Sequence, residues 1–329
     1  MKVRIYGAKQ DEIAFYETIR EQYPVEPVFA GEILTMDTVD QTRGFEAVWI
    51  LTMCKITREV AFALKENGVK YVVTRSAGWD HMDLAAMKEA GLKGANVPFY
   101  SPRAISEHAI LTALSILRCG KKQQHMIEAG NFTLAGVLGK ELNTMTAGVV
   151  GTGRIGYETI SFLKGFGCRV LAYDLYENEP TAKLAEYVPL NTLFSQADIV
   201  FFHCPLTEEN YHLLNREAIA GMKDGVYIVN NARGGLVEAE AVLEGLESGK
   251  IAGFGFDVYE NENVFLRKSG VKRESLDPVF QRLLAREDTI YTAHTGFYTD
   301  KAIESMIEVT LENLKEYAQT GNCRNELVK

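Results

Sequence analysis

The feature that most constrains this chain is an alternation, kept up almost from end to end, of short apolar runs rich in β-branched residues with helical patterns. Strands that alternate with helices form parallel sheets, because each helix carries the chain back so that the next strand starts in the same direction. The apolar runs of the first hundred residues are 3–7, 25–30, 47–51 and 71–75, with a shorter one near Ala95. The pattern predicts an α/β protein whose parallel sheets are covered by helices.

A second series of apolar runs begins near Ala147. It consists of AGVVG, CRVLAYD, DIVFFHC, GVYIVNNA, IAGFGFD and DTIYTAH, six candidate strands, which is the number in a complete dinucleotide-binding sheet. A long helical pattern, residues 102–129, separates the two series, and another, residues 300–319, follows the second. At 329 residues the chain is too long for one ordinary core, so we expect two domains.

The last helical pattern leaves the domain organisation open at this point. Residues 300–319 follow the final strand of the second series, so they can belong to the second domain. A chain that leaves one domain, builds the next and returns would instead cross twice, near residues 100 and 298. Periodicity does not distinguish the two arrangements.

Charge and cysteine usage exclude several classes of function. The net charge is -9 and no basic run exceeds a pair such as Lys121-Lys122, which disfavours a nucleic acid or an anionic membrane as partner. The amino terminus lacks the apolar core of a signal peptide, and no apolar run reaches membrane-spanning length. Five scattered cysteines without a CxxC pair favour reduced thiols in the cytoplasm and disfavour a metal site.

Three glycines with dinucleotide-binding spacing, Gly151, Gly153 and Gly156, follow the strand candidate AGVV. The first makes a tight turn, the second lets the backbone approach a pyrophosphate, and the third allows close packing of helix on strand. The helix that follows offers unpaired N–H groups and the positive end of its dipole to the anion. Glycine-rich turns are common, but the strand before and the helix after this one favour a dinucleotide site.

An acidic residue, Asp174, ends the next apolar run, CRVLAYD, about 20 residues after the glycines. A carboxylate at this place accepts hydrogen bonds from the ribose hydroxyls of NAD and repels the 2′-phosphate of NADP. The predicted cofactor is therefore NAD.

Charged and polar side chains follow three late strand candidates. GVYIVNNA ends at Arg233, IAGFGF is followed by Asp257, Glu260 and Glu262, and DTIYTA ends at His294. Because ligands bind at the carboxyl ends of parallel strands, we expect these side chains at one edge of the sheet. Each residue alone would be read as a surface charge, and their joint appearance favours a reactive site.

These residue types suit hydride transfer to a 2-oxo acid. A guanidinium such as that of Arg233 can grip the substrate carboxylate in fork geometry and polarise the adjacent carbonyl. The oxygen becomes an alkoxide as hydride arrives, so His294 must supply a proton, and general acids of this kind contribute about 10²–10⁴-fold. A carboxylate beside the imidazole would fix the ring.

The remaining histidines are weaker candidates. We expect His125 and His212 to be solvated and His108 to be packed and hydrogen-bonded. His81 belongs to the start of a helix, and His203, at a strand end, could line the cofactor pocket.

Seven segments make the sequence recognisable at the level of a family. They are TRSAGWDHMD (74–83), NVPFYSPRAISEHA (96–109), GVVGTGRIG (148–156), FHCPLTEEN (202–210), MKDGVYIVNNARGGLVE (222–238), FDVYENE (256–262) and AHTGFYT (293–299). On these residues the chain resembles the D-isomer-specific 2-hydroxyacid dehydrogenases, and within them the branch of the D-lactate, 2-hydroxyisocaproate and 2-hydroxyglutarate dehydrogenases.

The resemblance implies a role for each matching residue. Arg233 would bind the substrate carboxylate and carbonyl, His294 would be the acid/base, and Glu262 would be its partner, with Glu260 as second choice. The implied substrate-binding residues are Ala77, Gly78, Tyr100 and Tyr298. The implied NAD-binding residues, besides the three glycines, are Arg154, Ile155, Asp174, Cys204, Pro205, Asn210, Asn231, Ala232 and Asp257.

The resemblance also implies the architecture. It predicts two Rossmann-like domains with parallel sheets, of which the substrate domain is flavodoxin-like and discontinuous. Residues 1–100 and 299–329 would form that substrate domain, and residues 101–298 the NAD-binding domain. Family members close their cleft by a hinge motion and dimerise through the NAD-binding domain, which implies a homodimer here, formed around the long helix after Pro102.

The implied reaction is reversible hydride transfer between NADH and a 2-oxo acid, such as pyruvate giving D-lactate. Larger acids, namely 2-oxoglutarate, phenylpyruvate and branched-chain 2-oxo acids, fit the same carboxylate-binding core and stay open as alternatives. Trp79 stands where relatives often carry a smaller residue, and Lys55 would pair with a distal carboxylate if it faced the substrate. A non-catalytic NAD-sensing scaffold that retains the Arg/Glu/His set is the alternative from another class.

Overall fold

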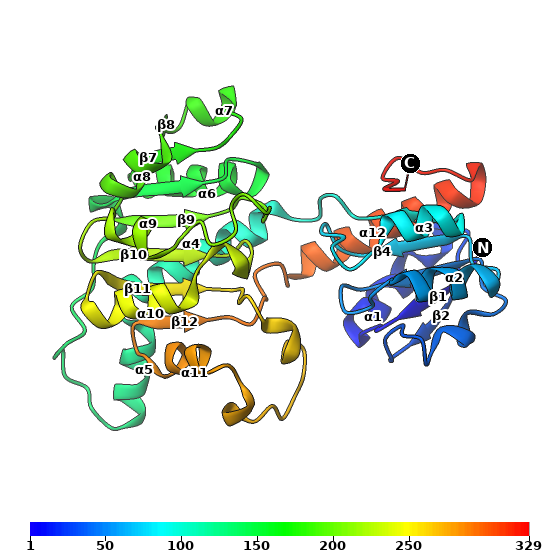
Figure 1. Ribbon diagram of the computed structural model, residues 1–329, viewed down its shortest axis with the longest axis horizontal. Helices are drawn as coiled ribbons and strands as arrows, with labels where there is room; N and C mark the ends of the chain where they lie inside the picture. The colour runs from blue at the N-terminus through cyan, green and yellow to red at the C-terminus, as the bar shows by residue number, and fades with distance from the viewer. Residues whose placement is uncertain (329) are drawn as a thin grey trace. The chain divides into compact units, whose positions relative to one another are not determined.

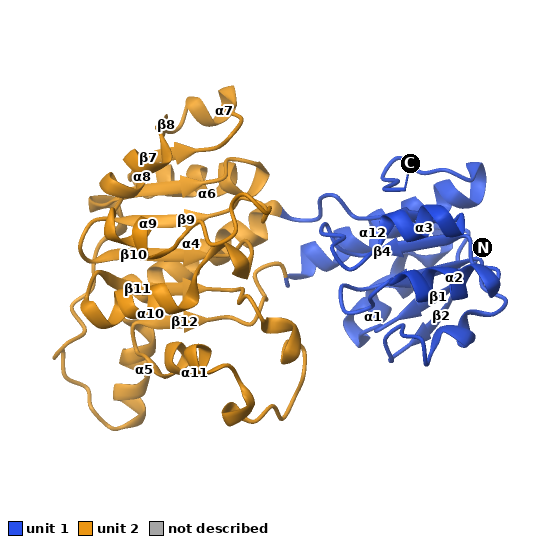
Figure 2. Ribbon diagram, in the orientation of Figure 1, with its two compact units in different colours: residues 1–101, 298–329 blue, residues 102–297 orange. Residues whose placement is uncertain are grey.

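The computed structural model describes residues 1–328 and divides into two compact units (Figure 2). Unit 1 consists of Met1–Ser101 with Tyr298–Lys329, and unit 2 of Pro102–Phe297. The chain therefore leaves unit 1, builds unit 2 and returns, so that the last helix belongs to unit 1. The ranges expected from the sequence differ from these by one residue at each crossing.

Unit 1 is a five-stranded sheet in the order β2-β1-β3-β4-β5, with every pairing parallel (Figure 1). Its strands are β1 (Lys2–Tyr6), β2 (Glu26–Ala30), β3 (Ala47–Ile50), β4 (Tyr71–Thr74) and β5 (Lys93–Ala95). Its helices are α1 (Gln10–Ile19), α2 (Arg58–Glu66), α3 (Leu84–Ala90) and α12 (Asp300–Thr320). This strand order is the flavodoxin-like one, as expected.

The terminal helix α12 is held on unit 1 by contacts with residues more than two hundred positions away. The ring of Tyr317 stacks on that of Tyr71 in β4, with centroids 4.4 Å apart. The Asn313 side-chain amide donates to the backbone oxygen of Asn96 at 2.8 Å, and both asparagines are buried. A buried amide of this kind needs its partner, so these bonds specify where the helix returns.

Unit 2 is a seven-stranded sheet in the order β12-β11-β10-β9-β6-β7-β8, again parallel throughout. Its strands are β6 (Thr146–Val150), β7 (Arg169–Tyr173), β8 (Glu186–Tyr187), β9 (Ile199–Phe202), β10 (Val226–Asn230), β11 (Ile251–Phe256) and β12 (Thr289–Tyr291). Its helices are α4 (Pro102–Leu117), α5 (Gly120–Glu128), α6 (Arg154–Gly165), α7 (Glu179–Ala182), α8 (Leu190–Gln196), α9 (Arg216–Ala220), α10 (Ala239–Ser248) and α11 (Pro278–Ala285). This is the doubly wound dinucleotide-binding order with one added strand.

The sheet of unit 2 is buried on both faces, which explains its continuously apolar strands. In β9, Ile199 and Phe201 pack into one core with α4 and α6, whereas Val200 and Phe202 pack into the other. All four side chains are fully buried. Successive residues of a strand point to opposite faces, so both must be apolar when helices cover both.

Two details differ from the sequence-based expectation. The helical pattern 102–129 is two helices, because Cys119 between them takes a left-handed conformation with φ 53° and starts α5 in a new direction. The strand β8 was not predicted, since two residues are too short to show a periodicity.

Candidate active site

Three neighbouring strands of unit 2 carry the residues predicted to react. The carboxyl ends of β10, β11 and β12 lead to Arg233, to Glu262 and to His294 respectively. The strands are parallel and adjacent, β10 to β11 and β11 to β12, so their carboxyl ends share one edge of the sheet. The structure thus brings these side chains to the edge where the sequence predicts a site.

His294 is paired with Glu262. Its Nδ1 lies 2.6 Å from Glu262 Oε1, and Nε2 makes no hydrogen bond within residues 1–328. The carboxylate is 8% exposed, and its other oxygen accepts from the backbone N–H of Tyr259 at 2.9 Å and from the Tyr291 hydroxyl at 3.4 Å. Burial, aided by the charge of Glu262, raises the pKa of Tyr291, so that phenol stays a donor. The pair fixes the ring and leaves Nε2 as the atom that can exchange a proton.

The backbone at His294 is unusual and is held by a residue that sequence reasoning missed. Ala293 and His294 both have left-handed φ values, 52° and 55°. Arg267 donates from Nη1 to the oxygen of Ala293 at 3.3 Å and from Nη2 to that of His294 at 2.6 Å. No motif marks Arg267, because it lies in the irregular segment after Glu262 and acts on backbone atoms.

Asp257 anchors the segment that carries His294. Its carboxylate accepts hydrogen bonds from the Thr292 hydroxyl at 2.5 Å and from the backbone N–H groups of Thr295 and Gly296 at 2.8 and 2.9 Å. Burial raises the pKa of this carboxyl, but the hydrogen bonds from His108, Thr292, Gly296 and Thr295 outweigh it and lower the pKa below its usual range. Asp257 is therefore an ionised anchor, and His108 is hydrogen-bonded as expected.

Glu260, the second choice as partner of the histidine, is engaged elsewhere. It accepts a hydrogen bond from the Tyr211 hydroxyl, and its other oxygen lies 3.2 Å from His212 Nε2. The expectation that His212 is solvated is wrong, because its ring also stacks on Tyr211 with centroids 3.9 Å apart. The structure thus pairs Glu262 rather than Glu260 with His294.

Arg233 is exposed on a rigid turn. Its guanidinium donates to the backbone oxygen of Ala232 at 2.8 Å and forms no ion pair within the described part of the chain. The Asn230 side chain fixes the turn, since it donates to the oxygen of Arg233 at 2.9 Å and accepts from the N–H of Ala232 at 3.1 Å. A Cβ on the following Gly234 would lie 2.2 Å from the backbone of Tyr259 and Glu260, so the turn packs directly on the segment that leads to Glu262. An unpaired guanidinium so placed can take an anion.

The glycine loop has the close backbone approaches that its spacing predicts. Gly151 has φ 93°, and a Cβ there would lie 2.4 Å from the backbone nitrogen of Cys204. A Cβ on Gly156 would lie 1.9 Å from the backbone oxygen of Gly151, whereas one on Gly153 would meet nothing within 4 Å. Gly153 is the N-cap of α6, which begins at Arg154, so the turn and the helix start are both available to a pyrophosphate.

The other predicted cofactor residues cluster around this loop and the neighbouring strand ends. Asp174, at the end of β7, accepts from the backbone N–H of Thr152 at 2.6 Å. Both side-chain polar atoms of Asn231 are buried without a partner in residues 1–328. Asn210 is bonded to its own loop, donating to Pro205 and accepting from Thr207. Ala232 is buried in the Arg233 turn, and the backbone oxygen of Ile155 accepts from Ser106.

Two partly buried side chains follow β9. Burial lowers the pKa of His203 to about 4, and its Nε2 bonds the Thr159 hydroxyl at 3.0 Å. Burial raises the pKa of the Cys204 thiol to about 11. Both groups are therefore neutral near pH 7, so neither competes with His294 as a proton carrier.

Unit 1 carries the residues expected to bind the substrate. The backbone oxygens of Ala77 and Gly78 accept from the side chains of Asn96 and Ser76 at 2.7 and 2.8 Å. The N–H groups of Ala77 and Gly78 donate to no acceptor within residues 1–328. The backbone oxygens of Ala77 and Gly78 therefore fix the loop, and the backbone N–H groups of the two residues remain available to bind a ligand.

The aromatic residues predicted for the pocket wall also lie in unit 1. The hydroxyl of Tyr298 donates to the carboxylate of Asp11, and Lys9 Nζ lies 4.5 Å from the centre of the Tyr298 ring. Tyr100 lies in the segment just before α4. Trp79 is 46% exposed, and Lys55 is exposed without an ion-pair partner in the described residues.

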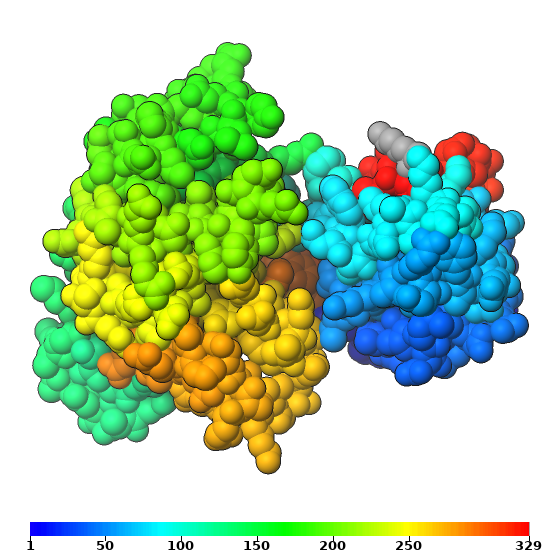
Figure 3. All heavy atoms as spheres, in the orientation of Figure 1, coloured from blue at the N-terminus to red at the C-terminus, as the bar shows by residue number. Residues whose placement is uncertain are grey.

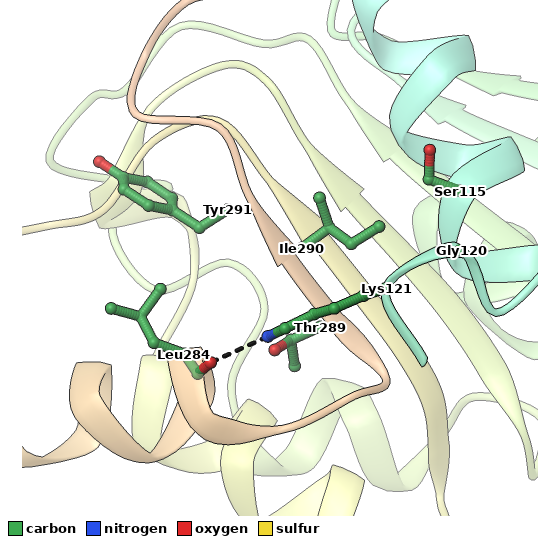
Figure 4. A pocket seen from close by; sticks show the side chains of 7 residues that line it. All are labelled: Ser115, Gly120, Lys121, Leu284, Thr289, Ile290 and Tyr291. Atoms are coloured by element: carbon green, nitrogen blue, oxygen red, sulfur yellow. Dashed lines mark hydrogen bonds between the residues drawn. The ribbon is translucent and has the colours of Figure 1, made fainter. Parts of the chain in front are cut away.

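An open depression elsewhere in unit 2 contains none of the predicted residues (Figure 4). Its wall includes Lys121, whose ammonium donates to the backbone oxygens of Leu284 and Arg286 at 2.8 and 2.6 Å. The lysine thus ties α5 to the last turn of α11 and the residue that follows that helix. Within residues 1–328 no group of three His, Cys, Asp or Glu side chains could hold a metal ion, and no helix is long and apolar enough to cross a membrane.

Comparison with known proteins places the chain in a family. Residues 110–296 match the model of the D-isomer specific 2-hydroxyacid dehydrogenase NAD binding domain. An aromatic 2-oxoacid reductase of Clostridium sporogenes is 39% identical over 100% of this chain and 99% of its own. A D-lactate dehydrogenase of Escherichia coli is 41% identical over 100% of both chains. A solved structure of D-2-hydroxyisocaproate dehydrogenase, 35% identical, superposes with a TM-score of 0.91 over 100% of both chains. The chain belongs to the D-isomer-specific 2-hydroxyacid dehydrogenases, which are NAD-dependent oxidoreductases.

Proposed function

We propose that this dehydrogenase interconverts pyruvate and D-lactate, with Arg233 and His294 acting on the substrate and Glu262 acting on His294. The pairing of His294 Nδ1 with the buried Glu262 carboxylate at 2.6 Å carries the proposal, because it leaves Nε2 as the proton-exchanging atom. A positioned acid of this kind contributes about 10²–10⁴-fold to the rate.

NAD fits the residues around the glycine loop. The close approach at Gly151, the N-terminus of α6 and the Asp174 carboxylate match the pyrophosphate and ribose of a dinucleotide. The Asn231 amide, which has no hydrogen-bond partner among residues 1–328, offers a donor and an acceptor that a ligand amide would satisfy. When bound, the dinucleotide supplies or takes up the hydride.

The protein's own groups handle the carboxylate and the proton. Arg233 holds the substrate carboxylate and polarises its carbonyl. The N–H groups of Ala77 and Gly78 are the proposed substrate-binding donors of unit 1. In reduction, the proton at His294 Nε2 passes to the oxygen of the carbonyl as its carbon gains a hydride. In oxidation, the same nitrogen takes the proton back, so one group serves both directions. Tyr100 and Tyr298 would flank the substrate side chain.

The test is NADH oxidation, followed by absorbance, across a panel of 2-oxo acids with the wild type, His294→Gln and Arg233→Gln. We expect rapid turnover of pyruvate and a drop of about 100-fold or more in both variants, with NADH affinity unchanged. Tight NADH binding without oxidation in the presence of any acid would contradict the proposal and favour an NAD-sensing scaffold.

A larger substrate is the second candidate. The aromatic 2-oxoacid reductase of Clostridium sporogenes is as similar to the chain as the D-lactate dehydrogenases are, and the exposed Trp79 follows the Ala77–Gly78 loop directly. Phenylpyruvate and branched-chain acids in the panel test this. For 2-oxoglutarate, Lys55→Ala is compared with wild type, and an unchanged Michaelis constant would exclude Lys55 as partner of a distal carboxylate.

We also infer a homodimer formed through unit 2. Three apolar side chains after α5, Phe132, Leu134 and Leu138, are 79%, 88% and 94% exposed. Helix α5 and the segment that follows it are coloured teal, at the lower left of unit 2 in Figure 3. Single exposed apolar residues are ordinary, but three of them in one seven-residue segment indicate a partner surface.

Sedimentation of a Leu134→Glu, Leu138→Glu double variant tests the dimer. We expect monomers, because a carboxylate at each position would have to be buried in the interface. Met36→Glu, which changes a 51% exposed side chain of unit 1, is the control and should leave the wild-type assembly intact. A double variant that sediments like wild type would contradict this interface.

The cytoplasmic location stays a prediction from cysteine usage.

A further inference from the structure

The carboxylate of Asp174 stands at the end of a hydrogen-bonded chain of side chains whose further members, Tyr187 and Asn178, lie outside every motif of the sequence. Asp174 Oδ2 accepts from the backbone N–H of Thr152 at 2.6 Å and from its hydroxyl at 3.1 Å. The Thr152 hydroxyl lies 2.7 Å from that of Tyr187. The Tyr187 oxygen in turn accepts from the backbone N–H of Asn178 at 3.2 Å.

The direction of these bonds follows from counting protons. A carboxylate accepts, so the single hydroxyl proton of Thr152 is used on Asp174. The Tyr187 hydroxyl must then donate its own proton to Thr152, and the Asn178 N–H donates to Tyr187. All donors in the chain point toward the negative charge, an arrangement in which each bond polarises and strengthens the next.

Asn178 is itself fixed, so the chain has a rigid origin. Its side-chain oxygen caps α7 by accepting from the N–H of Thr181 at 2.9 Å. The amide nitrogen is therefore the donor on the other side, and it lies 3.1 Å from the Thr152 backbone oxygen and 3.2 Å from the hydroxyl oxygens of Thr152 and Tyr187. The phosphate loop, the end of β7, the start of α7 and the short edge strand β8 are thereby joined through side chains.

The network leaves Asp174 oriented but not saturated. Oδ2 accepts two hydrogen bonds from Thr152, and Oδ1 accepts one from the backbone N–H of Tyr176 at 3.1 Å. A carboxylate offers about four lone-pair sites, so about one remains, on Oδ1. Thr152 is buried, whereas the carboxylate is partly exposed, so Oδ1 is the oxygen left for a ligand hydroxyl.

We propose that Tyr187, Thr152 and Asn178 are positioning residues that orient the Asp174 carboxylate toward the adenosine ribose of NAD. Tyr187, which lies in the two-residue strand β8, acts through Thr152. The affinity for NADH and the preference for NADH over NADPH both depend on this tyrosine. The inference rests on the proposed role of Asp174 in binding the ribose.

The experiment measures dissociation constants of NADH and NADPH by fluorescence titration without substrate. We expect Tyr187→Phe and Thr152→Val each to weaken NADH binding about tenfold, the effect of one lost hydrogen bond to a charged system. Binding of NADPH should weaken less, because a carboxylate free to turn away repels the 2′-phosphate less. The NADPH-to-NADH ratio of dissociation constants therefore falls.

Two control variants distinguish the loss of Asp174 orientation from a general disturbance of the fold of unit 2. Tyr227→Phe removes a hydroxyl of unit 2 that has no hydrogen-bond partner in residues 1–328, and it should bind both cofactors as wild type does. Thr152→Ser keeps the hydroxyl and should bind NADH as tightly as wild type, unlike Thr152→Val. This comparison tests the network even if Tyr187→Phe folds poorly.

Asp174→Asn tests the proposed binding of the ribose by Asp174 separately from the positioning of Asp174 by Tyr187 and Thr152. If Asp174→Asn leaves the NADPH-to-NADH ratio unchanged, the role of Asp174 is wrong and the inference falls with it. If Asp174→Asn lowers the ratio but Tyr187→Phe and Thr152→Val both bind like Tyr227→Phe, the ribose contact stands and the positioning network is wrong.

Discussion

At the scale of single residues, the proton-carrying histidine sits on strained backbone. Left-handed φ values at Ala293 and His294 each cost about 1 kcal/mol, because the Cβ atom approaches a carbonyl oxygen. Arg267 binds the two carbonyl oxygens and Asp257 accepts from the N–H groups just beyond them. The strain is thus offset by two charged side chains that have no contact with the reacting atoms.

Replacing Arg267 tests this account. In Arg267→Ala the two carbonyl oxygens lose their charged donor, so the His294 ring should lose its fixed position, and kcat should fall about tenfold or more. NADH affinity, measured by titration, should be unchanged, since the glycine loop is remote in sequence and in contacts. Equal loss of kcat and NADH affinity would show a general collapse instead.

The two glutamates after β11 provide a matched pair of substitutions. Glu262→Gln removes the charge that pairs with His294, so kcat/KM should fall about 10²-fold. Glu260→Gln removes the same charge two residues earlier, where it contacts Tyr211 and His212, and its effect should be at least tenfold smaller. Steady-state kinetics of both variants decide whether the pairing seen in the structure is the one that operates.

At the scale of elements, the phosphate loop and α6 depend on one backbone contact. A Cβ on Gly156 would overlap the backbone oxygen of Gly151 at 1.9 Å, so Gly156→Ala must displace the helix start. We expect the free energy of unfolding to fall by about 1–3 kcal/mol. Most of the affinity for NADH should also be lost.

Gly165→Ala, in the last turn of the same helix, is the control for that variant. A Cβ there meets nothing within 4 Å, so the substitution should stabilise unit 2 by about 0.5–1 kcal/mol through helix propensity. NADH titration and chemical unfolding measure both effects. Equal behaviour of the two alanines would show that packing at Gly156 is unimportant.

At the scale of the whole molecule, the two units can be followed separately. Both tryptophans, Trp49 and Trp79, lie in unit 1, so tryptophan fluorescence reports the unfolding of that unit. Unit 1 also contains His81, whose pKa burial lowers to about 4, against a smaller opposing effect of Asp80.

This histidine makes the stability of unit 1 depend on pH. Below about pH 6.5 His81 becomes protonated in the unfolded chain, whereas in the folded protein it stays neutral down to about pH 4. The unfolded state therefore binds more protons in this range, and the free energy of unfolding falls as the pH falls. The loss attributable to His81 should reach about 3 kcal/mol at pH 4. In His81→Gln this component should vanish from the fluorescence-detected unfolding curves, whereas an unchanged pH dependence would show that the folded and unfolded chains protonate His81 at the same pH.

Much of the fold and of the site follows from the sequence. All eleven predicted strands are present, and β8 is the strand that was missed, because a two-residue edge strand has no periodicity. The glycine spacing predicted the turn at Gly151, and the positions of Arg233 and His294 at strand ends predicted their common edge. These features are local: hydrophobic period, glycine conformation and the direction of a parallel strand are each set by a few neighbouring residues.

What the sequence could not determine are the contacts between segments far apart in the chain. The hydrogen bond from Arg267 to the backbone oxygen of His294 and the one between the hydroxyls of Tyr187 and Thr152 join residues 27 and 35 positions apart. Each depends on the angle at which a side chain leaves an irregular loop. The path of that loop is set by packing on neighbouring strands and not by the residues within it, so only the tertiary structure decides these pairings.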